Sequence, residues 1–492
     1  MHAGALRIAV GTVALGWSSV ALAHPLDDLP PGHWLELSLN TLDDVDPCPA
    51  QDCSYSAVEG LSGIIDDWCG GAFASGFGVS GGLVLHGGGH NGYFGSELYV
   101  FDVESQLWQR HTEPYDDGSG SVAPACDDAT GLYPDGSPCP THTYDRVQYD
   151  PVANAFVLLF STPDPVCGGC DAPYPVAFDF DDDTWALGQI HPAPSPATGG
   201  STAYDPTRNA IWYLPAYNGQ FAQYDLGAAQ WTLYDNYNLS IDAVSAIDPG
   251  RDLFVTVEGR ETQTVIVHDL ADPMAGGVTV TLDGSSPVLE SGAQGFVWDP
   301  VSEQFIGWAG GTEVWGLVPP DGDWQTNAWT WLRFDAADDN AVTPTDPNER
   351  GTYSRWRYVP AYNVFVVVNR TNDPVFAYRL TDDPGQGPND PGGTTGGDDG
   401  MDSSGGDPGG ATGGSASAGD TSGMSGGDAT MGDVGSSGGE GTGAGASDGD
   451  GGGCSCRTAG SEDGTPWWCV VGVVLTFGRR RGRPRGFFSA RA

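Results

Sequence analysis

The stretch "TAYDPTRNAIWYLP", residues 202–215, is one of five copies of the pattern that decides the fold. Each copy has a short apolar strand, an Asp-Pro or Val-Pro pair, a turn, and a second strand with alternating apolar residues. The proline sets φ for the turn, and the polar residues after it suit a type I geometry. The other copies are "VQYDPVANAFVLLF" (147–160), "SAIDPGRDLFVTVE" (245–258), "FVWDPVSEQFIGWA" (296–309) and "WRYVPAYNVFVVVN" (356–369).

A second pair of strands follows most copies, as in "PVAFDFDDDTWAL" (175–187) and "GQFAQYDLGAAQWTLY" (219–234). An Asp and a Trp six positions later, such as Asp102 and Trp108 or Asp225 and Trp231, mark this second hairpin. We expect the Asp to cap the third strand and the Trp to begin the fourth. Four short antiparallel strands, repeated every 43 to 60 residues, indicate an all-β fold of the β-propeller class.

Six such units can be counted, and we predict six four-stranded blades. They begin near Trp68, His142, Gly199, Ala243, Ala293 and Gly351. The last unit offers three strands only, and the sequence "HWLELSLN" (33–40) supplies a candidate for the fourth. We therefore predict that this N-terminal strand joins the last blade and closes the ring, which removes the exposed sheet edges of an open arc. Seven blades stay open as an alternative if the loops contain another sheet.

The two ends of the chain differ in composition from this body, which we place at residues 24–383. Residues 1–23 combine a basic start, an apolar run and an Ala-Leu-Ala ending, the pattern of a secretory signal peptide. Residues 384–453 are almost entirely Gly, Ser, Asp, Thr and Ala, a composition that predicts a disordered linker. We assign residues 454–492 to a sorting or membrane-anchor segment.

That last segment has Cys454 and Cys456, an apolar run at 467–478, and three arginines at 479–481. It resembles the myxobacterial C-terminal sorting signal, MYXO-CTERM. The resemblance implies secretion, processing by a membrane protease and retention at the cell surface or outer membrane, with Cys454 or Cys456 as the attachment site. A plain C-terminal anchor is the alternative, and in both cases membrane contact is expected through this segment alone.

The charge of the chain excludes several kinds of function. The net charge is −46, and all basic residues are arginines. The absence of lysine excludes Schiff-base chemistry and a P-loop lysine. The acidic balance argues against nucleic acid as a partner, because phosphate contacts need a basic surface. We expect a monomer with an extracellular carbohydrate or protein ligand.

Seven cysteines lie in the predicted body, where an oxidising compartment favours disulfides. Three pairs are close enough in sequence to staple loops: Cys48 with Cys53, Cys126 with Cys139, and Cys167 with Cys170. Connectivity cannot be derived from spacing, and the odd count leaves one cysteine unpaired or paired with another chain. No cofactor is expected, apart from calcium as an alternative at the acidic run "DFDDDTW" (179–185), which an exposed turn also explains.

The segment "GGLVLHGGGHNGYFGSELYVFDVESQLWQR" (81–110) resembles a kelch motif. The N-terminal half is similar to a group of secreted bacterial propellers related to the central domain of galactose oxidase. The matching segments are "HWLELSLNT" (33–41), "DWCGGAFAS" (67–75), "GGGHNGYFG" (87–95) and "YPDGSPCPTHTY" (133–144). The resemblance implies a fold and no particular reaction, and the copper ligands of galactose oxidase itself cannot be placed on this sequence.

One cluster of polar and aromatic residues stands out as a candidate ligand-binding site: His90, Asn91, Tyr93, His142, Tyr144 and Arg146. Loops of adjacent blades meet at one mouth of a propeller, so these residues of the first two units can converge there. We predict a surface-tethered module that binds carbohydrate or protein. A polysaccharide lyase, with a His or Tyr base and Arg146 neutralising a uronate, is one alternative. A structural or adhesion protein is another, in which His90 and His142 serve only turns and packing.

Overall fold

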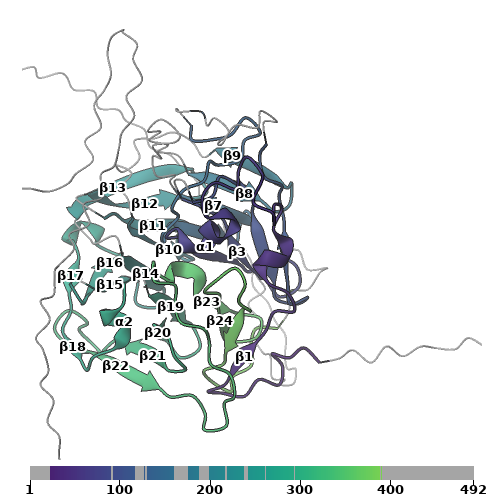
Figure 1. Cartoon of the computed structure of the whole chain (residues 1–492). Coiled ribbons are helices and arrows are strands. Elements are labelled where there is room, and N and C mark those ends of the chain that lie inside the picture. Colours follow the sequence, from purple (N-terminus) through teal and green to yellow (C-terminus); the bar gives the residue numbers. More distant parts are fainter. Residues whose placement is uncertain are drawn as a thin grey trace, which may run out of the picture. The chain divides into compact units, whose positions relative to one another are not determined.

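A computed structural model of the chain describes residues 23–89, 92–116, 127, 130–159, 175–187, 199–216, 219–237, 242–260, 262–292, 294–387 and 389. In this structure every copy of the repeated pattern forms the turn between the first two strands of a sheet. Six sheets lie around a common centre (Figure 1). The predicted all-β propeller with six blades is confirmed.

The chemistry of the repeated turn explains why the pattern recurs. The Oδ1 atom of Asp205 accepts hydrogen bonds from the backbone N–H groups of Thr207 (2.8 Å) and Arg208 (3.2 Å). Tyr204 donates its hydroxyl to Asn209 Oδ1 (3.0 Å), and Asn209 has the left-handed φ of 47° that asparagine tolerates well. The same tyrosine-to-asparagine bond joins Tyr149 to Asn154 and Tyr358 to Asn363.

The strands of the first three blades follow in chain order from the centre outward. The first blade has β2 (Gly71–Ala74), β3 (Gly82–Leu85), β4 (Tyr99–Asp102) and β5 (Leu107–Arg110). The second has β6 (Val147–Asp150), β7 (Ala155–Leu158), β8 (Val176–Asp179) and β9 (Thr184–Leu187). The third has β10 (Ser201–Asp205), β11 (Ala210–Leu214), β12 (Gly219–Asp225) and β13 (Gln230–Tyr237). The predicted Asp-to-Trp hairpins are confirmed, with Phe101 opposite Trp108 and Tyr224 opposite Trp231.

The last three blades show one departure from four strands. The fourth blade has β14 (Ala243–Asp248), β15 (Leu253–Glu258), β16 (Thr264–Asp269) and β17 (Val278–Thr279). The fifth has β19 (Gly295–Asp299), β20 (Gln304–Trp308), β21 (Val314–Val318) and β22 (Trp329–Phe334). A fifth strand, β18 (Leu282–Asp283), pairs in parallel with β22, which the repeat did not predict because β18 belongs to the connection between blades.

The sixth blade contains both ends of the propeller. Its strands are β23 (Arg357–Val359), β24 (Val364–Val367), β25 (Phe376–Tyr378) and β1 (Trp34–Glu36). Strand β1 pairs antiparallel with β25, with Leu35 opposite Ala377, and lies beside the green strands in Figure 1. The first strands contact one another in the order β2, β6, β10, β14, β19, β23 and back to β2. The predicted closure is confirmed, and the closed order leaves no place for a seventh blade.

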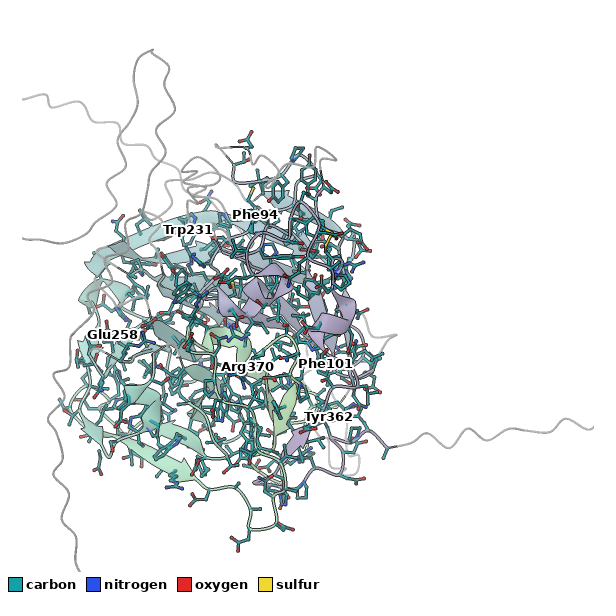
Figure 2. All side chains as sticks on the ribbon, viewed as in Figure 1. Phe94, Phe101, Trp231, Glu258, Tyr362 and Arg370 are labelled. Atoms are coloured by element: carbon teal, nitrogen blue, oxygen red, sulfur yellow. A yellow bond between two sulfur atoms is a disulfide. The ribbon has the colours of Figure 1, made fainter. Side chains whose placement is uncertain are left out.

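Apolar side chains fill the six interfaces between neighbouring blades, and each interface has its own buried cluster. Alternate residues of one strand point to opposite faces of a sheet. In β24, Val364 and Val366 therefore pack against the first blade, while Phe365 and Val367 pack against the fifth. Figure 2 labels Phe101 and Tyr362, which belong to the cluster between the sixth and first blades.

A buried polar network joins the innermost strands near the axis. Asp145 Oδ2, just before β6, accepts the backbone N–H groups of Thr202 (3.4 Å) and Ser245 (3.1 Å) from the third and fourth blades. Arg357, at the start of β23, donates to the carbonyl oxygens of Gly71 and Val147 in the first and second blades. Five of the six blades are thus tied together through two charged side chains.

Short helices occupy loops at the periphery and at one mouth: α1 (Gly63–Asp66), α2 (Pro287–Glu290), and the 3-10 turns η1 (Leu42–Val45), η2 (Gly60–Ser62), η3 (Pro273–Ala275) and η4 (Tyr353–Arg355). Among the described residues, no helix has the length and apolar character needed to cross a membrane.

Candidate functional site

Three loops meet at one mouth of the ring, each leading into the first strand of a blade. Tyr144, in the loop before β6, donates its backbone N–H to the carbonyl oxygen of Trp68 (2.6 Å), which lies in the loop before β2. Thr143 Oγ1 accepts the N–H of Gly70 (2.9 Å). Arg355, in η4 before β23, donates to the carbonyl oxygen of Cys69. The loops of the first, second and sixth blades are therefore fixed against one another.

The four sequence-predicted site residues that the structure describes lie at or near this mouth, and all four are buried. His142 is 5% exposed, Tyr144 3%, Arg146 0% and Tyr93 1%. His142 Nδ1 lies 2.7 Å from Asp67 O, and Arg146 Nη2 donates to His142 O (2.6 Å). His90 and Asn91 lie outside the described residues.

The glycine turn of the first blade does meet the second blade, as the sequence predicted. Gly87, Gly88 and Gly89 all have positive φ, which glycine adopts without strain. A Cβ atom on Gly89 would lie 2.4 Å from the His142 ring at Cε1. The glycine-rich sequence therefore allows the close approach of His142.

The backbone of Tyr93 bonds to Gly88 of this turn, and its side chain bonds to a buried acid. Its hydroxyl donates to Glu97 Oε1 (2.5 Å), and both side chains are enclosed. Burial raises the pKa of Glu97 to about 7, with the Tyr93 hydrogen bond opposing the shift. The binding roles of Tyr93, His142, Tyr144 and Arg146 remain predictions, and ligand contact would require these enclosed side chains to become accessible.

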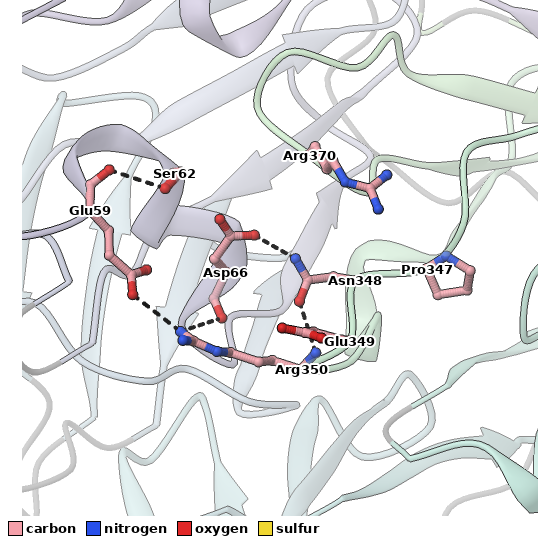
Figure 3. Close-up of a pocket in the computed structure, with 8 residues that line it drawn as sticks. All are labelled: Glu59, Ser62, Asp66, Pro347, Asn348, Glu349, Arg350 and Arg370. Carbon is pink, nitrogen blue, oxygen red and sulfur yellow. Dashed lines mark hydrogen bonds and ion pairs between the residues drawn. The ribbon is translucent and has the colours of Figure 1, made fainter. Parts of the chain in front are cut away.

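An open pocket lies beside this buried group, and the sequence did not predict it. It is a cavity of about 420 Å³ (Figure 3). Its walls come from the loop before β2, the loop before β23, and the turn between β24 and β25. The lining residues are Glu59, Ser62, Asp66, Pro347, Asn348, Glu349, Arg350 and Arg370.

Hydrogen bonds and ion pairs fix the base of this pocket (Figure 3). Asn348 donates through Nδ2 to an Asp66 carboxylate oxygen and accepts the N–H of Arg350 at Oδ1 (2.9 Å). The Arg350 guanidinium contacts Asp66 O (3.1 Å) and Glu59 Oε1 (3.5 Å). Glu349 and Arg370 are exposed at the rim.

Asp67 connects the open pocket with the buried group. It is 5% exposed, and its Oδ1 atom accepts a hydrogen bond from Arg350 Nη1 (2.6 Å). Burial, with repulsion from Glu59, raises the pKa of Asp67 to about 7, although Arg350 acts in the opposite direction. Arg350 also lies over the ring of Trp68, 4.7 Å from its centroid. Asp67 belongs to the segment "DWCGGAFAS" that carried the family resemblance, but no sequence signal links it to Arg350.

The cysteine predictions are tested only in part. Cys48 and Cys53 form the predicted disulfide. Cys139 is also disulfide-bonded. Cys69 is a free thiol, buried at the mouth, and burial raises its pKa. The predictions for Cys126, Cys167, Cys170, Cys454 and Cys456 lie outside the described residues.

The acidic run at 179–185 forms the tight turn between β8 and β9. Asp179 Oδ1 accepts the N–H groups of Asp181 (2.8 Å) and Asp182 (3.2 Å), and Asp181 accepts from Asn154 (2.6 Å). Where the structure is described, one set of His, Cys, Asp and Glu atoms lies close enough to share a metal ion, namely Cys48, Asp52 and Cys53. Its two sulfur atoms are joined in the disulfide, so this set offers no pair of thiolates.

Comparisons with known proteins do not give a family. No family model and no curated protein matches the sequence. Among solved structures, the chain is similar to a chain of the structure titled "Crystal Structure of Mitotic Checkpoint Complex", with a TM-score of 0.36 and 10% identity. That match covers 77% of this chain and 99% of the other. A likeness this distant carries no argument about function, and the fold assignment rests on the strand pairing described above.

Proposed function

We propose that this protein is a binding module that takes a carbohydrate in the open pocket formed by Glu59, Asp66, Asn348, Arg350 and their neighbours. The observation that carries the proposal is the polarity of the walls, since Pro347 is the single apolar residue among the eight. A ligand that binds there must replace the water on these groups with hydrogen bonds of its own.

The pocket offers donors and acceptors side by side. Asn348, Arg350 and Arg370 can donate, whereas Glu59, Asp66 and Glu349 can accept. A sugar hydroxyl is both a donor and an acceptor, so a ligand with several hydroxyl groups suits this mixture better than a purely anionic or apolar ligand does. The bonds at the base hold the polar groups in place before binding, which lowers the ordering cost.

In this proposal the protein is a secreted propeller that its C-terminal segment displays at the cell surface, as the sequence predicts. A protein ligand is the second candidate for the same mouth, and binding to a glycan array separates the two. The lyase alternative stays a prediction, and it would require the enclosed His142 and Arg146 to become accessible to a substrate.

The test is a glycan array probed with the purified full-length chain, followed by calorimetry with the best oligosaccharide. Glu349 and Arg370 are exposed at the rim, so changing them should leave folding intact. Glu349→Gln combined with Arg370→Gln should weaken binding at least tenfold, about 1.4 kcal/mol, without a change in melting temperature. Glu36→Gln, on the outer strand β1, is the matched control and should bind normally. Array binding that the double variant retains in full would contradict the proposal.

A further inference from the structure

The other mouth of the ring contains a second cavity, of about 410 Å³, with a different character. Its wall is built from the repeated pattern itself, because each blade contributes a residue from the end of its first strand. These residues are Phe73, Tyr149, Tyr204, Ile247, Trp298 and Tyr358. In five blades the proline of the turn also lines the cavity. The wall is therefore mainly aromatic and apolar.

A charged side chain lies in the floor of this cavity. Arg357 donates through Nε (3.0 Å) and Nη2 (2.8 Å) to Gly71 O, and through Nη2 to Val147 O (3.3 Å). None of the described residues accepts a hydrogen bond from its Nη1 atom, and the side chain lines the cavity beside Gln148. Its two unused N–H groups are both on Nη1, where they can donate charge-assisted hydrogen bonds to a carboxylate.

The acids near Arg357 do not neutralise it by direct contact. Asp145 attracts Arg357 electrostatically, but its carboxylate accepts N–H groups from Thr202 and Ser245 and forms no ion pair with Arg357. At the rim, the aspartates of the repeated turns accept the N–H groups of those turns, as Asp205 and Asp248 do. These two also pair with Arg208 and Arg251. The Nη1 group of Arg357 is thus left for a ligand.

We propose that this second cavity binds a small monocarboxylate with an aromatic or branched aliphatic body. The carboxylate lies against Nη1 of Arg357 in the floor, and the apolar body packs against the aromatic and proline side chains of the wall. This site is separate from the carbohydrate pocket, which lies at the opposite mouth and has polar walls.

The experiment uses the full-length chain and three probes in calorimetry: phenylacetate, its neutral amide 2-phenylacetamide, and acetate. Phenylacetate should bind, and both other probes should bind at least tenfold more weakly, because one lacks the charge and the other lacks the apolar body. Arg357→Gln should weaken phenylacetate binding at least tenfold. Arg333→Gln, which removes an exposed arginine on β22, should have no effect.

Arg357 also joins blades, so its replacement can impair folding. Trp298→Ala is the second variant, because Trp298 lies in the wall and is only partly buried. It should weaken phenylacetate binding at least fivefold while leaving carbohydrate binding at the other mouth unchanged. Equal affinity for phenylacetate and 2-phenylacetamide, absence of binding at millimolar concentration, or unchanged affinity in Trp298→Ala would overturn the proposal. Failure of the glycan array alone would leave it standing.

Discussion

Replacing Asp145 with Asn should change how the stability of the propeller depends on pH. Asp145 is buried near the axis and accepts N–H groups from Thr202 and Ser245. An asparagine can keep these bonds through its amide oxygen, with its NH₂ group toward Ser354, whose hydroxyl contacts the acid in the wild type. The substitution therefore removes a titrating group while preserving its shape and most of its contacts.

The magnitude follows from the pKa of Asp145. Burial raises that pKa from 3.8 to about 7, and attraction to Arg357 opposes the shift. Between these two values the folded chain keeps the proton while the unfolded chain loses it. The free energy of unfolding therefore falls as the pH rises through this range, and the loss is complete above pH 7. At about 1.4 kcal/mol per pKa unit, Asp145 accounts for a loss on the order of 4 kcal/mol.

Urea unfolding of the wild type and Asp145→Asn, at half-unit steps from pH 4 to pH 8.5, measures this difference. The free energy of unfolding of the variant minus that of the wild type should rise with pH by about 4 kcal/mol and level off above pH 7. Asp225→Asn, at an exposed hairpin turn, is the matched substitution control. Parallel curves for the wild type and Asp145→Asn would refute the reasoning, because they would mean that Asp145 has the same pKa in the folded and unfolded chains.

Three further changes test the packing that supports the ring. Trp34→Ala should lower the free energy of unfolding by about 3–5 kcal/mol in urea titrations, because Trp34 is 3% exposed in the interface between the fifth and sixth blades; a loss below about 1 kcal/mol would contradict its burial. Tyr204→Phe should cost about 1 kcal/mol by removing the hydroxyl bond to Asn209, and the control Tyr224→Phe should cost less; equal costs would count against the turn bond. Changing Cys48 and Cys53 together to Ser should lower the free energy of unfolding by about 2 kcal/mol, because the disulfide closes a short loop and so removes little entropy from the unfolded chain. An unchanged melting temperature would contradict this prediction.

Much of the fold could be predicted from the sequence because its determinants are local. The Tyr-Asp-Pro turns carry their own hydrogen bonds, as Tyr204, Asp205 and Asn209 show, so the pattern is visible in the sequence of each blade. Ring closure was predictable because the last blade lacked a strand and the segment at 33–40 was available. The β18 strand was missed because two residues in a connection leave no periodic signal.

The two pockets could not be predicted in the same way. The open pocket depends on Asp66 and Arg350, which are far apart in the sequence and have no shared spacing. The cavity at the other mouth had a visible signal, since an aromatic or apolar residue precedes the turn in every copy. In the sequence that residue is simply part of a strand, and only the ring arrangement places the six equivalent positions around one space. The sequence-predicted His142 and Arg146 converge with the first blade as expected, but they are packed inside.

The central claim is that the N-terminal strand closes the ring, because both mouths depend on the first and sixth blades lying side by side. Leu35 and Ala377 are direct partners across β1 and β25, and both contact the same apolar cluster. A full-length chain with Leu35→Cys and Ala377→Cys should form a disulfide between these positions, detected by peptide mapping with mass spectrometry. Leu35→Cys with Phe376→Cys should not, because Phe376 faces the opposite interface. Two freely alkylated thiols at 35 and 377 in the folded protein would contradict the account.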